Sequence, residues 1–515
     1  MKFSLFTTLA VCALSISIAP RLALAQFSWN VPAGAFDNPS NWDPNGVPGF
    51  FDEAIINNGG TSTYSTGDTQ IDSLSVASSV GTSGTFNATG GNLFPSVARI
   101  GERGTAIASV NGGTLQVGGG SLFVGGQDNS GVGTLNIAGG ANTLVTSGDD
   151  IGVGRVGTGT LNVSGGELRG VYTFIGKFGT GTWNHSGGLF RQTGGDIEIG
   201  DGGRPDQTGT SGPRTGTINL TGGVMQVWDS FAIGNRVGTG IVNISGGVLA
   251  LTGGNESGDL FVGRGADWAG EPDGVGGPVS LRVTGDDSII IGDGNFIMNA
   301  DKVASSSTLI AEITGATHTT IKVTGNADIT NGKLLVDLTG YAPVSGNSWT
   351  ILTAGADITA DKTAVDAIVA TAGFDPLVHA GPGTAGSLIG AFASTDFSLA
   401  PLTTGLSWNV AYANNSVVLS VTGTAVTFTA DFDHNGQVNS ADLTKWKADF
   451  GVNANSDANG DGKSDGTDFL IWQRQFGSGV PASAAIGAVP EPAAALLMAV
   501  ASVAAVGLRR RNFNC

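Results

Sequence analysis

A glycine-rich phrase that recurs between residues 85 and 248 constrains the fold of this chain more than any other feature. Its copies are TFNATGG at Thr85, TLNIAGG at Thr134, TLNVSGG at Thr160, TWNHSGG at Thr182, TINLTGG at Thr217 and VNISGG at Val242. The apolar residues alternate, which predicts short strands with one buried face, and the glycine pairs predict turns. Such a unit cannot bury its apolar face alone, so we expect stacked units with one continuous core.

A second phrase, an aliphatic residue before glycine, follows the first in each unit. It occurs at Ile100-Gly101, Val124-Gly125, Ile151-Gly152, Ile175-Gly176, Ile199-Gly200, Ile233-Gly234, Val262-Gly263 and Ile291-Gly292. We expect about nine coils with the strand spacing of about 4.8 Å. The predicted fold is therefore mainly β, a parallel β-solenoid over residues 26–300 with a β-rich closing segment over residues 301–425.

Composition supports this fold and limits the partners. The chain has 85 glycines among 515 residues and only 13% charged residues, which favours closely spaced turns over helices. A net charge of −18 disfavours nucleic acid and anionic lipid surfaces, and it suits calcium.

Several polar residues of the repeat have both a functional and a structural interpretation. The sequons at Asn87, Asn162, Asn184, Asn219 and Asn243 fit glycosylation, but their recurrence favours a ladder of stacked amides. His185 stands at an inward position, and we expect it in the core rather than as a base. The acidic pairs Asp149-Asp150 and Asp286-Asp287 could serve as an acid and a base, but without an Arg-x-Lys neighbour they favour turns.

The segment before the repeats contains Trp29, Trp42, Phe50 and Phe51. These aromatics predict a cap over the first coil, with a sugar-stacking platform as the alternative. The repeat and this lead-in resemble glycine-rich repeat proteins of environmental bacteria, planctomycetes among them. That resemblance covers roughly residues 27–425, and it implies that residues 309–421 close a passenger-like β-rich region.

Two twelve-residue loops, Asp431–Asp442 and Asp457–Asp468, match calcium-binding loops. Oxygen-bearing side chains occupy positions 1, 3, 5, 9 and 12, glycine occupies position 6, and position 7 can offer its carbonyl oxygen. The second loop has four carboxylates at these positions against three in the first, so we expect the second site to bind calcium more tightly.

The duplication extends beyond the loops. Leu443, Trp446, Phe450 and Gly451 recur 26 residues later as Phe469, Trp472, Phe476 and Gly477. Each set predicts one helix with an apolar stripe that ends at glycine. The stretch before Asp431 is strand-like, so an ordinary pair of EF-hands is disfavoured.

This arrangement resembles a type I dockerin over residues 426–479. The resemblance implies two Ca²⁺ ions, held by Asp431, Asp433, Asn435, Gln437, Asn439 and Asp442 and by Asp457, Asn459, Asp461, Lys463, Asp465 and Asp468, with Gln437 and Lys463 acting through carbonyl oxygens. It also implies a cohesin-like partner, contacted through Ser440, Ala441, Gly466 and Thr467. An extracellular polysaccharide is the alternative partner.

Both ends carry export signals. Residues 1–25 have the charged, apolar and small-residue order of a secretory signal peptide. After a linker at residues 480–489, Pro490, Glu491 and Pro492 precede an apolar stretch and then Arg509, Arg510 and Arg511. Residues 490–515 resemble a PEP-CTERM sorting signal, which implies a transmembrane helix and processing by an exosortase-type enzyme.

These features predict an exported cell-surface or extracellular-matrix protein, structural or adhesive rather than enzymatic. The alternatives are a polysaccharide-active β-helix enzyme, either a lyase or a glycoside hydrolase, and a carbohydrate-binding protein. A cleft that gathers carboxylates with Arg or Lys on one face would favour the enzyme. An exposed row of aromatic residues would favour the carbohydrate-binding protein.

Overall fold

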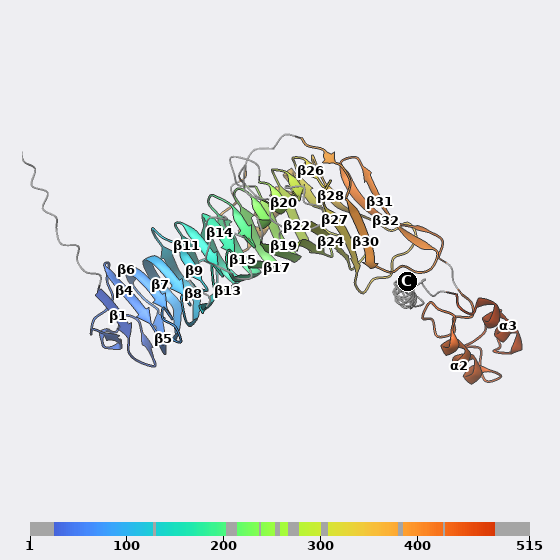
Figure 1. Cartoon of the computed structure of the whole chain (residues 1–515), viewed down its shortest axis with the longest axis horizontal. Helices are drawn as coiled ribbons and strands as arrows, with labels where there is room; N and C mark the ends of the chain where they lie inside the picture. The colour runs from blue at the N-terminus through green and yellow to red at the C-terminus, as the bar shows by residue number, and fades with distance from the viewer. Residues whose placement is uncertain are drawn as a thin grey trace, which may run out of the picture. The chain divides into compact units, whose positions relative to one another are not determined.

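The computed structural model describes residues 25–126, 130–201, 214–235, 238–252, 258–265, 278–299, 307–377, 379, 385–425 and 428–478 (Figure 1). The fold of these residues is mainly β, as predicted, with 32 strands in one hydrogen-bonded sheet. The chain divides into two compact units, one comprising residues up to 401 with 408–421 and the other residues 402–407 with those from 422 onward. We call the β-rich part of the first unit the strand stack, and residues 428–478 the loop–helix unit.

The strand stack consists of parallel strands arranged in three ladders. The first ladder contains β2 (Ala33–Ala35), β5 (Asn58–Tyr64), β7 (Ser83–Ile100), β8 (Thr105–Val117), β10 (Val132–Ile137), β13 (Thr158–Gly170), β15 (Thr180–Gln192), β17 (Thr215–Val227), β19 (Thr239–Leu251), β21 (Val279–Thr284), β24 (Ser307–Ile313), β27 (Lys333–Leu338) and β30 (Ser394–Leu399).

The second ladder uses the later halves of the long strands β7, β8, β13, β15, β17 and β19. It also contains β6 (Asp68–Val76), β11 (Leu144–Ser147), β22 (Ser288–Gly292), β25 (Ile321–Val323) and β28 (Ser348–Thr353).

The third ladder contains the ends of β6 and β7 and the shortest strands. These are β1 (Ala25–Trp29), β4 (Asp52–Ile56), β9 (Leu122–Val124), β12 (Asp150–Val153), β14 (Tyr172–Ile175), β16 (Ile197–Ile199), β18 (Phe231–Asn235), β20 (Leu260–Gly265), β23 (Phe296–Met298), β26 (Ala327–Asp328) and β29 (Leu388–Ile389).

A few elements lie at the ends of the stack. β3 (Trp42–Asp43) pairs antiparallel with β1 and follows the 3-10 helix η1 (Pro39–Asn41). β32 (Ser416–Gly423), which follows β31 (Leu406–Ala413), pairs antiparallel with β28. The sequence at 301–425 continues the parallel ladders through β24, β27 and β30 before this change of direction.

Register in the first ladder places like residues above one another. Leu135, Leu161, Trp183, Ile218 and Val242 occupy successive rungs, and all five are buried. Because neighbouring strands pair without a slip over these positions, the alternation in sequence becomes one continuous apolar column.

The second phrase was assigned wrongly in two coils. Ile151 lies beside Thr173, and Val153, not Ile151, lies beside Ile175. The turn therefore falls at Gly154, whose φ of 66° is close to the 71° of Gly176 in the next coil. This turn position requires glycine, because a Cβ at Gly176 would collide with the carbonyl oxygen of Thr215. Ile291-Gly292 likewise belongs to the second ladder, where Gly292 pairs with Val323. Two adjacent aliphatic–glycine pairs made the first of these assignments ambiguous in sequence.

The expected asparagine ladder is confirmed for Asn162, Asn184, Asn219 and Asn243, whereas Asn87 lies beside Thr63 and Ser109, outside the ladder. Asn162 Nδ2 donates to Asn136 Oδ1 at 2.8 Å, Asn184 to Asn162 at 2.8 Å, Asn219 to Asn184 at 2.8 Å and Asn243 to Asn219 at 2.9 Å. Asn162, Asn184 and Asn219 therefore both donate and accept along the stack. The recurrence of asparagine therefore has a structural cause in the first ladder.

His185 lies in the core, as expected. It is fully buried beside Trp183, between Val163 and Leu220 of the neighbouring rungs. Neither ring nitrogen has a hydrogen-bond partner among the described residues. Burial lowers the pKa of His185 to about 4.

The amino-terminal aromatics form a cap, and the tryptophans do not form an exposed platform. Trp29 and Trp42 are buried with edge-to-face rings 4.9 Å apart, and Phe36 packs edge-on against Trp42. Phe50 and Phe51 remain exposed. The apolar end of the stack is thus covered by large rings, as stacked repeats require.

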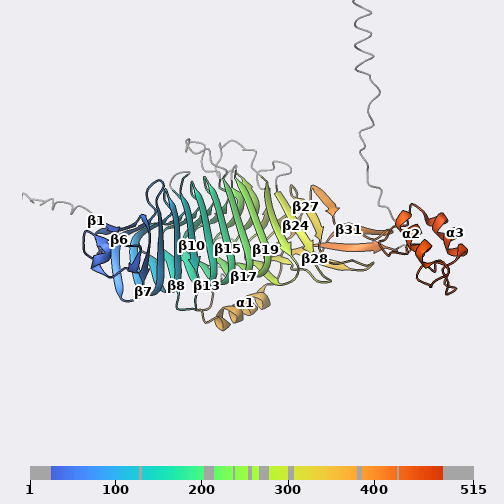
Figure 2. The ribbon, with the colours of Figure 1, turned by 90° about the horizontal axis from the view of Figure 1, so that it is seen from below.

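One helix was not expected. α1 (Thr359–Thr371) lies on the outside of the strand stack, within the segment 301–425 predicted to be β-rich (Figure 2). Its Val365 and Val369 pack with Val224, Val248 and Ile291 of the second ladder. The helix forms because its apolar residues recur at helical spacing and cover apolar side chains that the ladder turns outward.

The loop–helix unit contains α2 (Ser440–Asp449) and α3 (Gly466–Gln475). No helix in the described part of the chain is long and apolar enough to cross a membrane. Of the predicted signal peptide only Ala25, the first residue of β1, is described. The linker at 480–489, the predicted transmembrane helix and the sorting residues lie outside the described residues; the sorting residues are Pro490, Glu491, Pro492, Arg509, Arg510 and Arg511.

Candidate metal centre

The first loop brings three carboxylates together. One oxygen each from Asp431, Asp433 and Asp442 lies within 4.8 Å of the others, and this is the one such group found in the described part of the chain. Backbone amides hold the carboxylates in place. Asp431 Oδ2 accepts from Gly436 N at 2.7 Å, and Asp442 Oδ1 accepts from Phe432 N at 2.8 Å.

The second loop repeats this hydrogen-bond pattern. Asp457 Oδ2 accepts from Gly462 N at 2.6 Å, and Asp468 Oδ1 accepts from Ala458 N at 2.8 Å. Position 3 carries Asn459 in place of aspartate. The two loops therefore share a backbone scaffold, but position 3 of the second supplies an amide oxygen instead of a carboxylate.

The sharp turn at position 6 uses glycine in both loops. Gly436 has a φ of 80° and Gly462 a φ of 83°. Position 4 is also left-handed, with a φ of 58° at His434 and 76° at Gly460. The first loop thus places a non-glycine residue in a backbone conformation that glycine adopts more readily.

The other predicted ligands lie along the same loops. Asn435 and Asp461, at position 5, accept from the backbone N–H of Gln437 at 2.9 Å and of Lys463 at 3.0 Å. Asn439 and Asp465, at position 9, instead cap the helices. Asn439 Oδ1 accepts from Ala441 N and Asp465 Oδ1 from Thr467 N, each at 2.7 Å.

Position 12 completes a capping box in both copies. Asp442 Oδ2 accepts from Asn439 N, and Asp468 Oδ2 accepts from Asp465 N, each at 2.7 Å. Both carboxylates are fully buried. The same residue therefore joins each loop to its helix, so loop geometry and helix start are linked.

Each helix also contacts the other loop, a pairing that the spacing of residues in the sequence does not predict. Trp446 Nε1 donates to Asp465 O at 3.0 Å, and Trp472 Nε1 donates to Asn439 O at 2.9 Å. The glycines after the helices do the same, since Gly451 N donates to Ser464 O and Gly477 N to Val438 O. The sequence shows that Trp and Gly recur 26 residues apart. It does not show that each of them bonds to the loop of the other copy.

The core between the helices is small. It consists of Ala430, Phe432, Val438, Ala458 and Trp472, with Leu443, Trp446 and Phe469 packed against it. The predicted stripe is only partly buried, because Phe450 and Phe476 remain exposed at the helix ends and touch Trp446 and Trp472 edge-on.

The electrostatics differ between carboxylates. Loss of hydration raises the pKa of Asp433, and the negative charges of Asp442 and Asp431 add to the rise. Backbone N–H groups, that of Gly462 first, lower the pKa of Asp457. Hydrogen bonds from Ser456, Lys445 and Asn453 lower the pKa of Asp449 to about 2, and Asp449 thereby ties the end of α2 to the following turn.

The first loop fits a calcium ion, because its three converging carboxylates are hard oxygen donors. The backbone carbonyl oxygen of Gln437, at position 7, can serve as a further ligand. Asp431, Asp433 and Asp442 would hold the ion. The four predicted partner-binding residues, Ser440, Ala441, Gly466 and Thr467, lie exposed in the first turns of α2 and α3.

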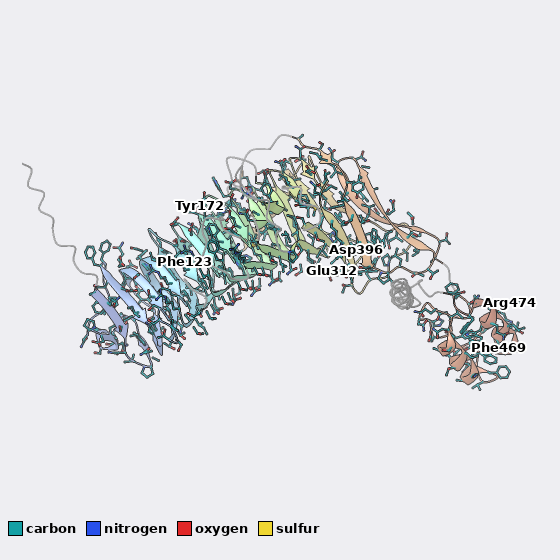
Figure 3. The ribbon with its side chains drawn as sticks, in the orientation of Figure 1. Phe123, Tyr172, Glu312, Asp396, Phe469 and Arg474 are labelled. Atoms are coloured by element: carbon teal, nitrogen blue, oxygen red, sulfur yellow. The ribbon has the colours of Figure 1, made fainter. Side chains whose placement is uncertain are left out.

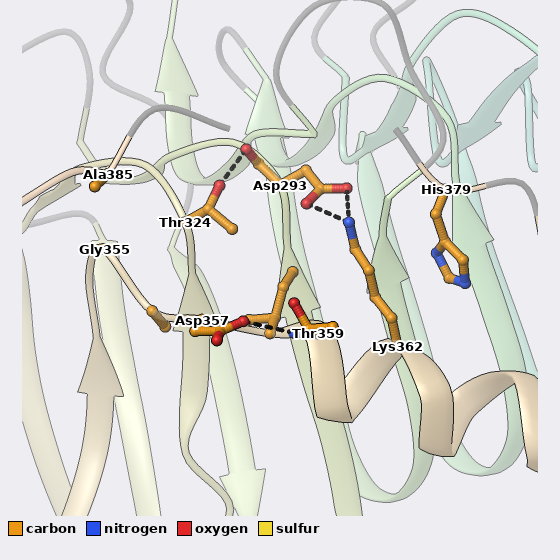
Figure 4. Close-up of a pocket in the computed structure, with 10 residues that line it drawn as sticks. Asp293, Thr324, Gly355, Asp357, Thr359, Lys362, His379 and Ala385 are labelled. Atoms are coloured by element: carbon orange, nitrogen blue, oxygen red, sulfur yellow. Dashed lines mark hydrogen bonds and ion pairs between the residues drawn. The ribbon is translucent and has the colours of Figure 1, made fainter. Parts of the chain in front are cut away.

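A second candidate site is a cavity of about 430 Å³ between α1 and the strand stack (Figure 4). Lys362 Nζ donates to both carboxylate oxygens of Asp293 at 2.7 Å. Burial raises the pKa of Asp293 although Lys362 opposes the rise, and hydrogen bonds from Thr359 lower the pKa of Asp357. His379 Nε2 lies 3.0 Å from Asp366 Oδ1. The cavity therefore gathers carboxylates with a lysine, but Asp293 is held in an ion pair.

No family model matches this chain, and neither a curated protein nor a solved structure does.

Proposed function

We propose that this chain is an exported surface protein without enzymatic activity, in which a parallel β-solenoid is a spacer and a dockerin-like module binds a partner in a calcium-dependent way. The observation that carries the proposal is the convergence of Asp431, Asp433 and Asp442 in a loop that is repeated 26 residues later. A random acidic cluster on a surface would not be duplicated together with its turn glycine, its helix cap and its tryptophan.

The solenoid part of the proposal is supported by the parallel register. Residues 24 or more positions apart in sequence, such as Asn219 and Asn243, lie side by side through many successive rungs. A fold that grows by adding identical rungs keeps its ends apart and offers long faces, which suits a spacer or an adhesive surface.

Calcium would neutralise the crowded carboxylates and stabilise the loop geometry from which each helix starts. The crossed bonds of Trp446 and Trp472 would then transmit order in one loop to the other helix. The exposed first turns of the helices, at Ser440-Ala441 and Gly466-Thr467, would present the partner-binding surface.

Binding of a panel of cohesin modules to the purified chain tests this proposal, with calcium and with chelator in parallel. We expect binding only with calcium, and its loss in Asp433→Ala. Lys447→Ala, an exposed change on α2 outside the loops, is the matched control. Calcium-independent binding, or no calcium uptake at all, would contradict the proposal.

A second candidate function, a polysaccharide lyase or hydrolase, is favoured by one observation. The cavity beside α1 contains Asp293 and Asp357, whose pKa values are shifted in opposite directions, as an acid and a base require. Incubation with a range of polysaccharides tests this candidate. Product release that disappears in both Asp293→Asn and Asp357→Asn would support it.

The export part of the proposal rests on the two terminal signals. We expect the mature surface form to begin near Gln26 and to end near Pro490. Intact-mass measurement of protein from the native host tests this expectation, and a mature form that retains Met1 or Cys515 would contradict it.

A further inference from the structure

The third ladder carries an outward column of side chains that the calcium proposal does not use. Phe123 stands between the buried residues Leu122 and Val124, so its ring faces outward. The register then places Gly152 and Phe174 on the next two strands of the column. Two aromatic rings are therefore separated by one strand without a side chain at the same position.

A cavity of about 90 Å³ fills this gap, lined by Phe123, Asp150, Gly152, Arg155, Phe174, Lys177 and Phe178. Gly152 is required for it, because a Cβ there would come within 2.9 Å of the Phe123 ring. Phe123 leans over the glycine and forms one side of the cavity. The aromatic surfaces are thus half-exposed rather than part of the core.

Two cations lie over these rings. The Arg155 guanidinium carbon is 5.1 Å from the centre of the Phe123 ring, and Lys177 Nζ is 3.7 Å from the centre of the Phe174 ring. Lys177 Nζ also lies 3.6 Å from Asp201 Oδ2. Contact with the rings holds both charged groups in place, so less side-chain entropy is lost when they bind an anion.

The opposite side of the cavity has a carboxylate, that of Asp150, and a further ring lies next to the cavity without lining it. Asp150 is aligned with Tyr172 on the next strand, and Tyr172 is 44% exposed. The Tyr172 ring is parallel to that of Phe174 within 7° and leans over Gly195, where a Cβ would collide with it. Figure 3 shows Phe123 and Tyr172 on the same side of the strand stack.

The prediction of turn residues is correct for Asp149, Asp286 and Asp287, which lie in bends, but not for Asp150. Asp150 begins β12 and is half-buried, and Arg155 and Lys177 act on its charge. Burial raises the pKa of Asp150, and the charge of Asp149 adds to the rise. The basic neighbours come from five residues later in the same coil and from the next coil, so an Arg-x-Lys motif was not needed.

We propose that this cavity binds an acidic sugar residue of a polysaccharide. Arg155 and Lys177 bind the anionic group of the sugar, the rings of Phe123 and Tyr172 contact its C–H face, and Asp150 accepts a hydrogen bond from a hydroxyl group. The anionic group is a carboxylate or a sulfate ester, because both have oxygens that a guanidinium and an ammonium bind. The proposal does not depend on the calcium loops.

A similar pair farther along the same ladder favours a polymer as the ligand. Phe261 lies three strands beyond Phe174, a distance of about 14 Å at the usual strand spacing. The Arg264 guanidinium carbon lies 5.2 Å from the centre of the Phe261 ring, and its Nη1 donates to Asp196 Oδ2 at 2.6 Å, so an acidic group there would share the guanidinium with Asp196. A linear chain with repeated acidic groups can contact both pairs.

Titration of the full chain with oligosaccharides, in the presence of chelator, tests the proposal. The probes are a hexamer of galacturonate, a sulfated galactan oligomer and a neutral dextran oligomer. We expect an acidic probe to bind and dextran not to bind. Arg155→Ala should weaken binding about tenfold or more, and Phe123→Ala by a similar factor.

Matched variants separate binding from folding. Tyr172→Phe should keep the affinity while Tyr172→Ala lowers it, because the ring and not the hydroxyl group makes the contact. Arg103→Ala removes an exposed positive charge elsewhere in the stack and should leave binding unchanged. Melting temperatures of all variants should equal that of the wild type.

The probes also identify the anionic group. Binding of galacturonate assigns a carboxylate, and binding of only the sulfated oligomer assigns a sulfate ester; either supports the site. Binding of no acidic probe, equal binding of dextran, or unchanged affinity in both Arg155→Ala and Phe123→Ala would overturn it. Because chelator is present throughout, failure here leaves the calcium proposal standing, and failure of calcium binding leaves this one standing.

Discussion

The strand stack and the loop–helix unit are stabilised by different interactions. The stack buries column after column of apolar residues, and its inward positions hold no charge in the rungs around Ile175. The loop–helix unit has a core of a few residues and collects carboxylates instead. The hydrophobic effect stabilises the first with no ligand, whereas the second has little apolar area to bury and gains from a cation.

This difference teaches where a single charge matters. In the stack an added charge has no solvent and no partner, so it should be strongly destabilising. In the loop–helix unit removing a charge should matter more than adding one, because the carboxylates are the groups that a metal joins.

The largest effect should come from Ile175→Asp. Ile175 is fully buried between Val153 and Ile199, and an unpaired carboxylate there should cost more than about 4 kcal/mol of unfolding free energy. Denaturant unfolding followed by β-sheet circular dichroism measures this loss. Ile107→Asp is the control, since Ile107 is 46% exposed, and it should change stability by about 0.5 kcal/mol or less.

A smaller loss of unfolding free energy should follow when the pH is lowered. The pKa of His185 in the folded state, about 4, is below its unfolded value of about 6.5, so the unfolded chain binds the proton first. Stability should be complete above pH 6.5 and fall as the pH drops toward 4, by about 3 kcal/mol from this residue. In His185→Leu that part of the pH dependence should vanish, and a profile identical to wild type would contradict the assignment.

Calcium removal should act only on the loop–helix unit. At 100 times the dissociation constant, one bound ion adds about 2.7 kcal/mol of stability, which chelator should remove. Helical circular dichroism should then melt at a lower temperature while the β signal stays unchanged. Helical signal that ignores chelator would show that the metal does not stabilise this fold.

The same titration can separate the two loops. We expect the second site to be the tighter because it has four carboxylates at ligand positions, so Asp461→Ala should remove the tighter transition and Asp433→Ala the weaker one. The close spacing of Asp431, Asp433 and Asp442 in the first loop instead favours tighter binding at the first site. Loss of the tighter transition in Asp433→Ala would show that spacing outweighs charge.

The smallest effect should come from Asn162→Ala in the asparagine ladder. The change removes one hydrogen bond to Asn136 and one from Asn184, which together should cost about 1–2 kcal/mol. Thermal unfolding measures the difference from wild type. A cost as large as that of Ile175→Asp would mean that amides, not apolar columns, dominate the stability of the stack.

Local sequence patterns predicted the elements but not all of their neighbours. The alternation around Leu161 or Ile218 was sufficient for a strand, because the pattern itself states which face is buried. The pattern was not sufficient to decide whether the turn falls at Gly152 or at Gly154, because both follow an aliphatic residue. Only the pairing of Val153 with Ile175 places the turn at Gly154. α1 was missed in a β-rich context, although Val365 and Val369 have helical spacing.

The sequence by itself determined that this chain is mainly β with repeated strands, that its asparagines recur in register, and that two loops have the oxygen pattern of calcium sites. Those properties depend on residue type and spacing along the chain. Only the tertiary structure decided that α1 covers the second ladder, that Trp446 and Trp472 cross to the opposite loops, and that Arg155 and Lys177 meet Asp150 between aromatic rings. Such contacts depend on which rungs become neighbours, and that is set by register and insertion length across the whole stack.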